Sequence, residues 1–193
     1  MKMYIDGCWV DASDGQTFEV INPATEDIID SVPSATLQDV DASVASSKRA
    51  FKSWRKTTAS DRSHMLKLAS RKLEENAEKY HLLLTQEEGK HLNEHIEELE
   101  VSIETIDYYA QLIKSGIGRV LPANNQSCIN LVIKEPYGPT ACIIPFNYPF
   151  LLLFWKIAPA LAAGNTVIVK PAEKAPSGSM TPSRITSMDH LAG

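Results

Sequence analysis

The chain has 193 residues, with 19 basic and 24 acidic side chains and a formal net charge of −5. That length fits one domain or parts of two, and the 44% hydrophobic and 22% charged residues exclude a disordered or fibrous chain. The negative charge argues against a nucleic-acid partner, and three cysteines do not form a disulfide framework. Residues 1–6 contain no apolar leader, and the apolar stretch 150–163 is too short to span a bilayer. We therefore expect a cytoplasmic α/β protein with no membrane partner.

The first 33 residues predict short strands separated by turns. Asp6-Gly7 is a strong hairpin dipeptide between Tyr4-Ile5 and Trp9-Val10. Residues 17–21 alternate in polarity, and Asn22-Pro23 ends that strand.

Residues 36–116 change to helical spacing and predict four helices. Thr36 to Asp39 resembles a capping box, Ser60 is expected to cap the second helix, and the third should run from Asn76 to a C-terminal cap at Gly89. The fourth carries a core-facing apolar stripe: Leu92, Ile96, Leu99, Ile103, Ile106, Ala110 and Ile113.

Glutamates crowd this helical region, with ten of them between positions 74 and 104. A run of like charges on helices is usually a solvated face. We therefore expect these side chains to face solvent rather than to form a functional acidic patch.

Residues 120–136 predict a projecting β-hairpin, followed by a strand–helix–strand unit over residues 140–170. Its parts are a buried strand at 140–144, a buried helix at 149–163 and a second buried strand at 166–169. A crossover of this kind implies that the two strands are parallel, because a tight turn cannot join parallel strands.

Asn147 lies between two prolines at the exit of the first buried strand. Ligands of open α/β sheets bind at the carboxyl ends of the strands, where an amide can donate to a developing oxyanion. The alternative is that Asn147 is only the N-cap of the helix that Pro149 begins. The residues themselves leave both readings open.

Lys156 interrupts a helix that is otherwise apolar nearly all round, so we expect it to be buried and to need an anionic or hydrogen-bonding partner. The alternative is a packed stem with its head in solvent. At the end of the second strand, Lys170 and Glu173 suit ribose hydroxyls and a phosphate, or are two exposed loop charges. The sequence His91 to His95 fits H-x-x-E-H, but no third ligand is identifiable, so we expect no metal.

Three segments together resemble the aldehyde dehydrogenase superfamily: residues 143–149 (IIPFNYP), residues 155–165 (WKIAPALAAGN) and residues 170–173 (KPAE). Ile5-Asp6-Gly7, residues 22–25 and Glu88-Gly89-Lys90 fit the same pattern. The resemblance covers residues 3–176. It implies a Rossmann-like parallel-sheet cofactor domain, with NAD- or NADP-dependent oxidation of an aldehyde to a carboxylic acid.

The resemblance also implies site residues. In the family, the residue matching Asn147 stabilises an oxyanion, and the residue matching Lys156 belongs to a charge relay in some members. The matches to Ile144, Pro145, Phe146, Lys170, Pro171, Ala172 and Glu173 line the dinucleotide site.

The family's nucleophilic cysteine and general-base glutamate have no match in this chain, and family chains are more than twice as long. Cys142, in an apolar strand, is expected to be a core residue. We therefore expect a truncated or frame-shifted chain that is inactive alone and binds NAD or NADP weakly or not at all. The alternative is a non-catalytic fragment that associates through the exposed hairpin strand.

The expected division has four parts. Residues 1–119 are strands and helices of the cofactor domain, residues 120–137 form an oligomerisation hairpin, residues 138–176 form the βαβ unit, and residues 177–193 are a tail unlike the family. The family forms homo-oligomers.

Overall fold

A computed structural model describes residues 1–116 and 118–176, so the expectation for the tail at 177–193 lies outside the described residues. Its strands are β1 (Met3–Ile5), β2 (Cys8–Val10), β3 (Thr17–Ile21), β4 (Ile28–Pro33), β5 (Arg119–Leu121), β6 (Asn130–Val132), β7 (Pro139–Ile143) and β8 (Thr166–Lys170). Its helices are α1 (Leu37–Trp54), α2 (Ala59–Glu75), α3 (Ala77–Glu88), α4 (Leu92–Leu112), the 3-10 helix η1 (Ile113–Ser115) and α5 (Pro149–Ala162).

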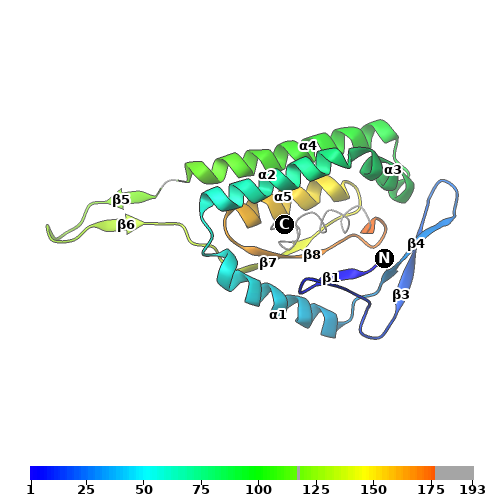
Figure 1. Cartoon of the computed structure of the whole chain (residues 1–193), viewed down its shortest axis with the longest axis horizontal. Coiled ribbons are helices and arrows are strands. Elements are labelled where there is room, and N and C mark those ends of the chain that lie inside the picture. Colours follow the sequence, from blue (N-terminus) through cyan, green and yellow to red (C-terminus); the bar gives the residue numbers. More distant parts are fainter. Residues whose placement is uncertain (117, 177–193) are drawn as a thin grey trace.

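The strands β7 and β8 are parallel, and α5 connects them, which confirms the predicted βαβ unit. Their register runs from Pro139 opposite Thr166 to Ile143 opposite Lys170. Helix α1 packs against β7 and β8, and α5 packs against them from the side where α2 and α4 form an outer layer (Figure 1). Within the described ranges, no helix is both long enough and apolar enough to cross a membrane.

Local signals set most helix ends. Thr36 and Asp39 form the predicted capping box of α1. For α2, the predicted cap at Ser60 is wrong: the cap is Thr58, whose hydroxyl accepts from the amide of Asp61 while the Asp61 carboxylate accepts from the Thr58 amide. Gly89 ends α3 in the left-handed conformation (φ 72°), as expected for a C-terminal glycine cap.

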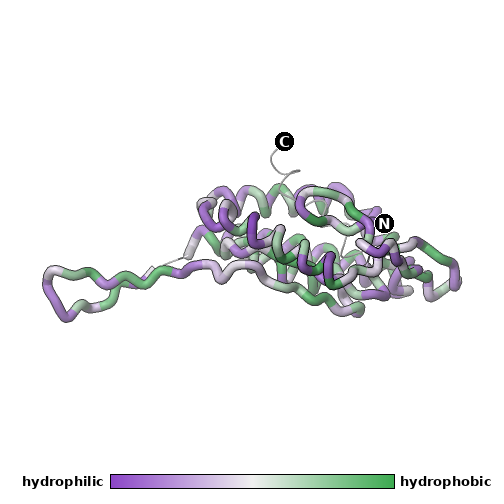
Figure 2. Tube along the Cα trace, turned by 90° about the horizontal axis from the view of Figure 1, so that it is seen from below, coloured by the Kyte–Doolittle hydropathy of each residue, from purple (hydrophilic) through white to green (hydrophobic). Residues whose placement is uncertain are grey.

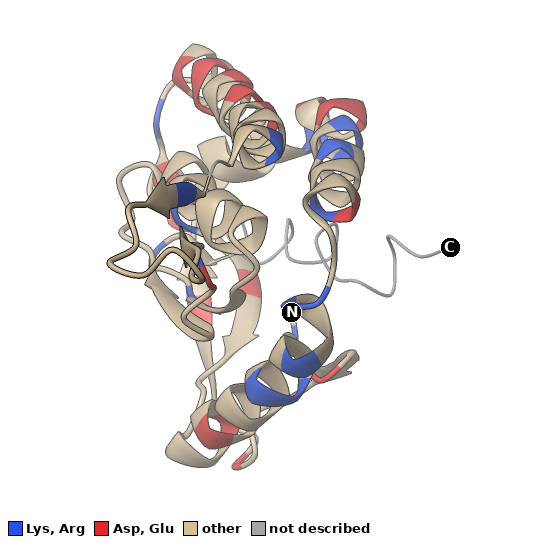
Figure 3. Ribbon diagram, turned by 90° about the vertical axis from the view of Figure 1, so that its left-hand side faces the viewer, with Lys and Arg blue, Asp and Glu red and all other residues tan. Residues whose placement is uncertain are grey.

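The core lies between α2, α4 and α5. The α4 stripe contributes Leu99, Ile106 and Ala110, which are buried in one cluster with Phe150 and Phe154 of α5. Acidic residues follow the outer side of α4 (Figure 3), and Glu94, Glu97, Glu100 and Glu104 are exposed. The prediction of a solvated glutamate face therefore holds for much of the run, but it is wrong for Glu87 and Glu98, which are buried, and for Glu88, whose side chain is 4% exposed.

Antiparallel hairpins are formed by β1 with β2, β3 with β4 and β5 with β6. Asp6 and Gly7 both have positive φ (54° and 77°) in the predicted turn between β1 and β2. The hairpin of β5 with β6 extends far from the remaining elements (Figures 1 and 2). Its strands are shorter than the predicted 127–135 strand, with only residues 130–132 paired to residues 119–121.

Candidate functional site

The candidate site lies at the carboxyl edge of the parallel pair. The Ile144 amide donates to the Lys170 carbonyl at 3.0 Å, continuing the ladder one step past β7. Ile144 is buried, whereas Pro145, Phe146 and Asn147 are exposed in the loop that leads to α5. The two sequence-predicted groups, residues 144–147 and 170–173, are therefore brought together at one edge.

Asn147 is not the N-cap of α5. The N-cap is Tyr148, and it provides no side-chain cap, which overturns the capping reading of Asn147. In the described part of the chain, the Asn147 side chain makes no hydrogen bond. The first-turn amides of Phe150 and Leu151 instead donate to Oε1 of Glu98 in α4, at 2.9 and 3.1 Å.

Lys156 is exposed, so the expectation of a buried lysine is wrong. The helix α5 buries one side against the core, while Trp155 (53% exposed) and Lys156 lie on its accessible side. The Lys156 ammonium donates to the Ile143 carbonyl at the end of β7. This contact ties α5 to the strand end from which the site loop departs.

Lys170 and Glu173 are ion-paired and both exposed. The hydrogen bond from Lys170 lowers the pKa of the Glu173 carboxyl below its usual value. Between them Pro171 is half-buried and Ala172 is buried. A paired ammonium and carboxylate at a strand's carboxyl end present both a donor and an acceptor to hydroxyl groups of a ligand.

The three cysteines are free. Burial raises the pKa of the Cys142 thiol, so this group stays protonated in its strand and is a poor nucleophile. Cys8, at the start of β2, and Cys128, between β5 and β6, are both exposed.

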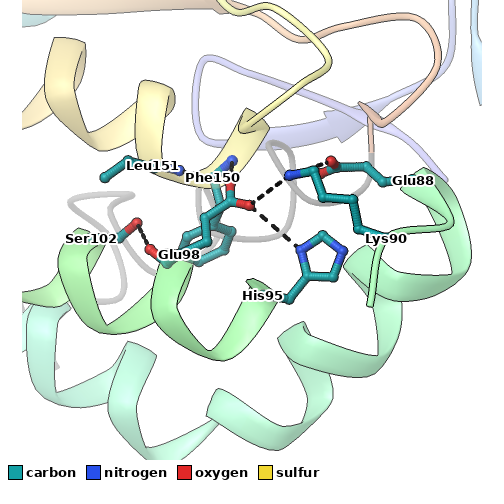
Figure 4. A network of polar contacts seen from close by, with 7 residues as sticks. All are labelled: Glu88, Lys90, His95, Glu98, Ser102, Phe150 and Leu151. Atoms are coloured by element: carbon teal, nitrogen blue, oxygen red, sulfur yellow. Dashed lines mark hydrogen bonds and ion pairs between the residues drawn. The ribbon is translucent and has the colours of Figure 1, made fainter. Parts of the chain in front are cut away.

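A buried ionic network behind the site was missed by sequence reasoning (Figure 4). The Lys90 ammonium lies 2.9 Å from Glu88 and 3.6 Å from Oε2 of Glu98, and 3.8 Å from the centre of the Tyr148 ring. Nδ1 of His95 is 3.5 Å from the same Glu98 oxygen. Burial raises the pKa of Glu88 to about 7, although Lys90 opposes that shift.

The sequence contains a spacing pattern that indicates part of this network. His95, Glu98 and Ser102 follow one another at three- and four-residue steps on the same side of α4 as the apolar stripe. Helical spacing alone therefore placed a carboxylate among core positions.

The H-x-x-E-H segment is not a paired-histidine site. His91 is exposed at the N-terminal cap of α4, where Nδ1 accepts from the Asn93 amide, whereas His95 is fully buried. Ligand atoms of Glu88, His95 and Glu98 do lie within 4.8 Å of one another. Lys90 already provides a cation between the two carboxylates, so the network is balanced by an ammonium.

A shallow groove of about 420 Å³ runs beside α5. It is lined by α4 and α5 residues: Val101, Glu104, Thr105, Tyr108, Tyr109 and Trp155.

Comparison with known proteins gives one consistent match. Residues 9–187 match the aldehyde dehydrogenase family. The chain is 37% identical over 176 residues to D-glyceraldehyde dehydrogenase (NADP(+)) of Picrophilus torridus, covering 91% of this chain and 36% of that protein. It is 39% identical over 172 residues to the mitochondrial succinate-semialdehyde dehydrogenase of Arabidopsis thaliana, covering 89% of this chain and 33% of that protein.

Solved structures agree. An aldehyde dehydrogenase from Brucella melitensis biovar abortus 2308 matches 96% of this chain and 38% of its own, with a TM-score of 0.93 and 34% identity. A betaine aldehyde dehydrogenase from Staphylococcus aureus in complex with NAD+ matches all of this chain and 39% of its own, with a TM-score of 0.95 and 30% identity. The chain thus spans 33–39% of the length of these four proteins.

Proposed function

This chain belongs to the aldehyde dehydrogenase family, and from that premise we propose that it carries part of the machinery for NAD- or NADP-dependent oxidation of an aldehyde to a carboxylic acid. The observation that carries the proposal is the position of Asn147. Its amide is exposed at the carboxyl end of a parallel strand and has no capping role, because Glu98 caps α5 instead. It is therefore available to a ligand.

Asn147 is the proposed oxyanion donor. When a nucleophile attacks an aldehyde, the carbonyl oxygen gains negative charge, and a fixed amide N–H stabilises that charge best when it need not reorganise. Lys156 supports this geometry by holding the Ile143 carbonyl, two residues before the loop that leads to Asn147.

The nucleotide is proposed to lie along residues 144–146 and 170–173. Lys170 and Glu173 would contact ribose hydroxyls through the donor and acceptor that they present, and their exposure fits this role. When bound, the nicotinamide supplies the hydride acceptor of the reaction. The name of the Picrophilus torridus relative specifies NADP(+), and the similar Staphylococcus aureus structure is a complex with NAD+.

The 193-residue chain is proposed to be inactive alone. Of its cysteines, Cys142 is buried and protonated, and Cys8 and Cys128 lie on hairpins outside the candidate site. Covalent aldehyde oxidation requires an activated thiolate, and loss of a nucleophile costs many orders of magnitude in rate.

The test combines turnover and binding. With a panel of aldehydes, the chain should produce no reduced NAD or NADP; any aldehyde-dependent reduction would refute the proposed inactivity. In an NMR titration, NAD should shift the amides of residues 144–147 and 170–173 with a Kd of roughly 1 mM or weaker, because only a few hydrogen bonds are available. Lys170→Ala should abolish these shifts, and Lys134→Ala, at an exposed lysine outside the candidate site, is the matched control. A nucleotide response elsewhere on the chain would contradict the proposed site.

A second candidate function rests on the β5–β6 hairpin, whose apolar side chains project into solvent: Val120 (73% exposed), Ile129 (79%), Leu131 (65%) and Ile133 (69%). We propose that this hairpin pairs with another copy of the chain, either as the homo-oligomer interface of the enzyme or as the sole activity of a non-catalytic fragment. Size-exclusion chromatography beside the nucleotide titration separates the two: a chain that associates and shows the NAD-dependent shifts supports the enzyme interface, and one that associates without them supports the fragment.

A further inference from the structure

The start of α5 is capped from a distant helix. Pro149 has no N–H to donate, and the Leu152 amide donates to the Tyr148 carbonyl at 2.9 Å. The two remaining first-turn amides, of Phe150 and Leu151, both go to Oε1 of Glu98, which is 52 residues away from Phe150 in the chain. All backbone donors of this turn are therefore satisfied without any side chain of the 145–148 loop.

A buried carboxylate needs compensation, which Glu98 receives as two hydrogen bonds on Oε1 and as longer ionic contacts on Oε2. Its side chain is fully buried. Oε1 faces the positive end of the α5 dipole, while Oε2 faces Lys90 at 3.6 Å and the His95 ring at 3.5 Å (Figure 4). Glu88 faces the same ammonium at 2.9 Å, so Lys90 is shared between two carboxylates.

The same network reaches the loop directly. Lys90 lies over the ring of Tyr148, the residue after Asn147. Tyr148, Phe150 and Leu151 thus each contact Glu98 or Lys90, and these two residues come from α4 and from the connection between α3 and α4, not from the site loop.

We propose that Glu98 is a positioning residue for Asn147: by taking the amides that an N-terminal asparagine would otherwise cap, it fixes the start of α5 and leaves the Asn147 amide free for the oxyanion. This inference rests on the proposed function for the role of Asn147, and on the contacts above for the role of Glu98. A local asparagine cap would turn the side-chain oxygen of Asn147 toward the amide of Phe150 or Leu151, and the N–H donors on the same amide would then no longer be free to point toward substrate.

The experiment measures this arrangement in the isotopically labelled 193-residue chain, with neither nucleotide nor aldehyde present. Through-hydrogen-bond NMR couplings should connect the Phe150 and Leu151 amides to the side-chain carboxyl carbon of Glu98. Absence of both couplings in the unaltered chain would overturn the proposal without any substitution.

Variants then test the effect on Asn147. Glu98→Ala should accelerate hydrogen exchange at Phe150 and Leu151 by roughly tenfold to a hundredfold, since hydrogen bonds to charged groups are lost. It should also shift the side-chain amide signals of Asn147. Glu98→Gln keeps an acceptor and should restore most of the protection, while Glu97→Gln, an exposed neighbour in α4, should change neither signal.

The role proposed for Glu98 and the proposed function can fail independently of each other. Unchanged Asn147 signals in Glu98→Ala, or in Glu98→Gln if the alanine variant does not fold, together with faster exchange at Phe150, would show a merely structural cap and overturn the proposal. Because no ligand enters the measurement, this failure would leave the proposed nucleotide and aldehyde chemistry intact, and the failed titration described above would leave the Glu98 contacts intact.

Discussion

Glu88 is the residue whose protonation the fold changes most clearly. Burial raises its pKa from 4.5 to about 7, so the folded chain binds a proton more tightly than the unfolded chain between these values. Stability should therefore fall as pH rises from about 4.5 to about 7, because the folded state must give up that proton. The contribution is on the order of 1–3 kcal/mol.

The prediction is tested with Glu88→Gln, which removes the titrating group and keeps its shape. Urea unfolding near pH 5 and near pH 8 should show a smaller loss of stability in this variant than in the unaltered chain. Glu94→Gln, an exposed glutamate of α4, removes one charge equally and should leave the pH dependence unchanged. Equal pH dependence in all three proteins would show that Glu88 does not carry the effect.

Residue-level prediction from the sequence was uneven for a physical reason. Asn147 and the pair Lys170–Glu173 could be singled out because they lie at strand ends, which local pattern reveals. The spacing of Glu98 in α4 indicates its buried position, but its partners Lys90 and Phe150 could not be identified, because they lie outside α4. Lys156 was expected inside because its neighbours are apolar, yet the helix keeps one side accessible.

At the scale of elements, Gly89 packs the end of α3 against the turn between β3 and β4, although the two segments are far apart in the sequence. It ends α3 with φ 72°, and a Cβ on it would lie 2.7 Å from Cγ of Pro23, in the turn between β3 and β4. The residues Asn22-Pro23 and Glu88-Gly89-Lys90 therefore meet in space. A substitution at Gly89 should lower the free energy of unfolding for two reasons: backbone strain at the positive φ and a steric clash with Pro23.

Gly15 is a matched control that isolates the steric clash, because it has nearly the same φ (71°) but nothing within 4 Å of a built Cβ. Gly15→Ala should lose about 1–2 kcal/mol of unfolding free energy from backbone strain alone. Gly89→Ala should lose about 1–3 kcal/mol more, because Pro23 must move. Chemical denaturation of both variants measures the difference, and equal losses would mean that the turn yields without cost.

Element existence was more predictable than element ends. Four helices and the parallel βαβ unit followed from hydrophobic period, which a core imposes along each segment. The α2 cap was placed two residues late, at Ser60, because both Thr58 and Ser60 are capping types and only Thr58 has an aspartate three residues on. The strand predicted at 127–135 is paired only over residues 130–132 in the structure. An alternating pattern predicts an extended segment, but it does not predict how long the partner strand is, and β5 has only three residues.

At the scale of the whole molecule, the β5–β6 hairpin is the surface that we expect to mediate self-association. Val120 and Leu131 are directly opposed across it, so they share one face, and Ile129 and Ile133 extend that face along the same chain segment. A two-stranded ribbon with an exposed apolar face is marginally stable by itself and gains from a partner strand or surface. We expect the chain to self-associate through this face.

Leu131→Lys tests this expectation, because a charge at the centre of the face must be desolvated for the copies to pair. Sedimentation or size-exclusion analysis should show the variant with a smaller apparent mass than the unaltered chain at the same concentration. Ser127→Lys adds the same charge in the hairpin loop, where the residue is exposed and away from the paired strands, and should leave the mass unchanged. If both variants kept the mass of the unaltered chain, association would have to run through another surface, and β7 and β8, which pair only with each other among the described strands, would be the next edge to block.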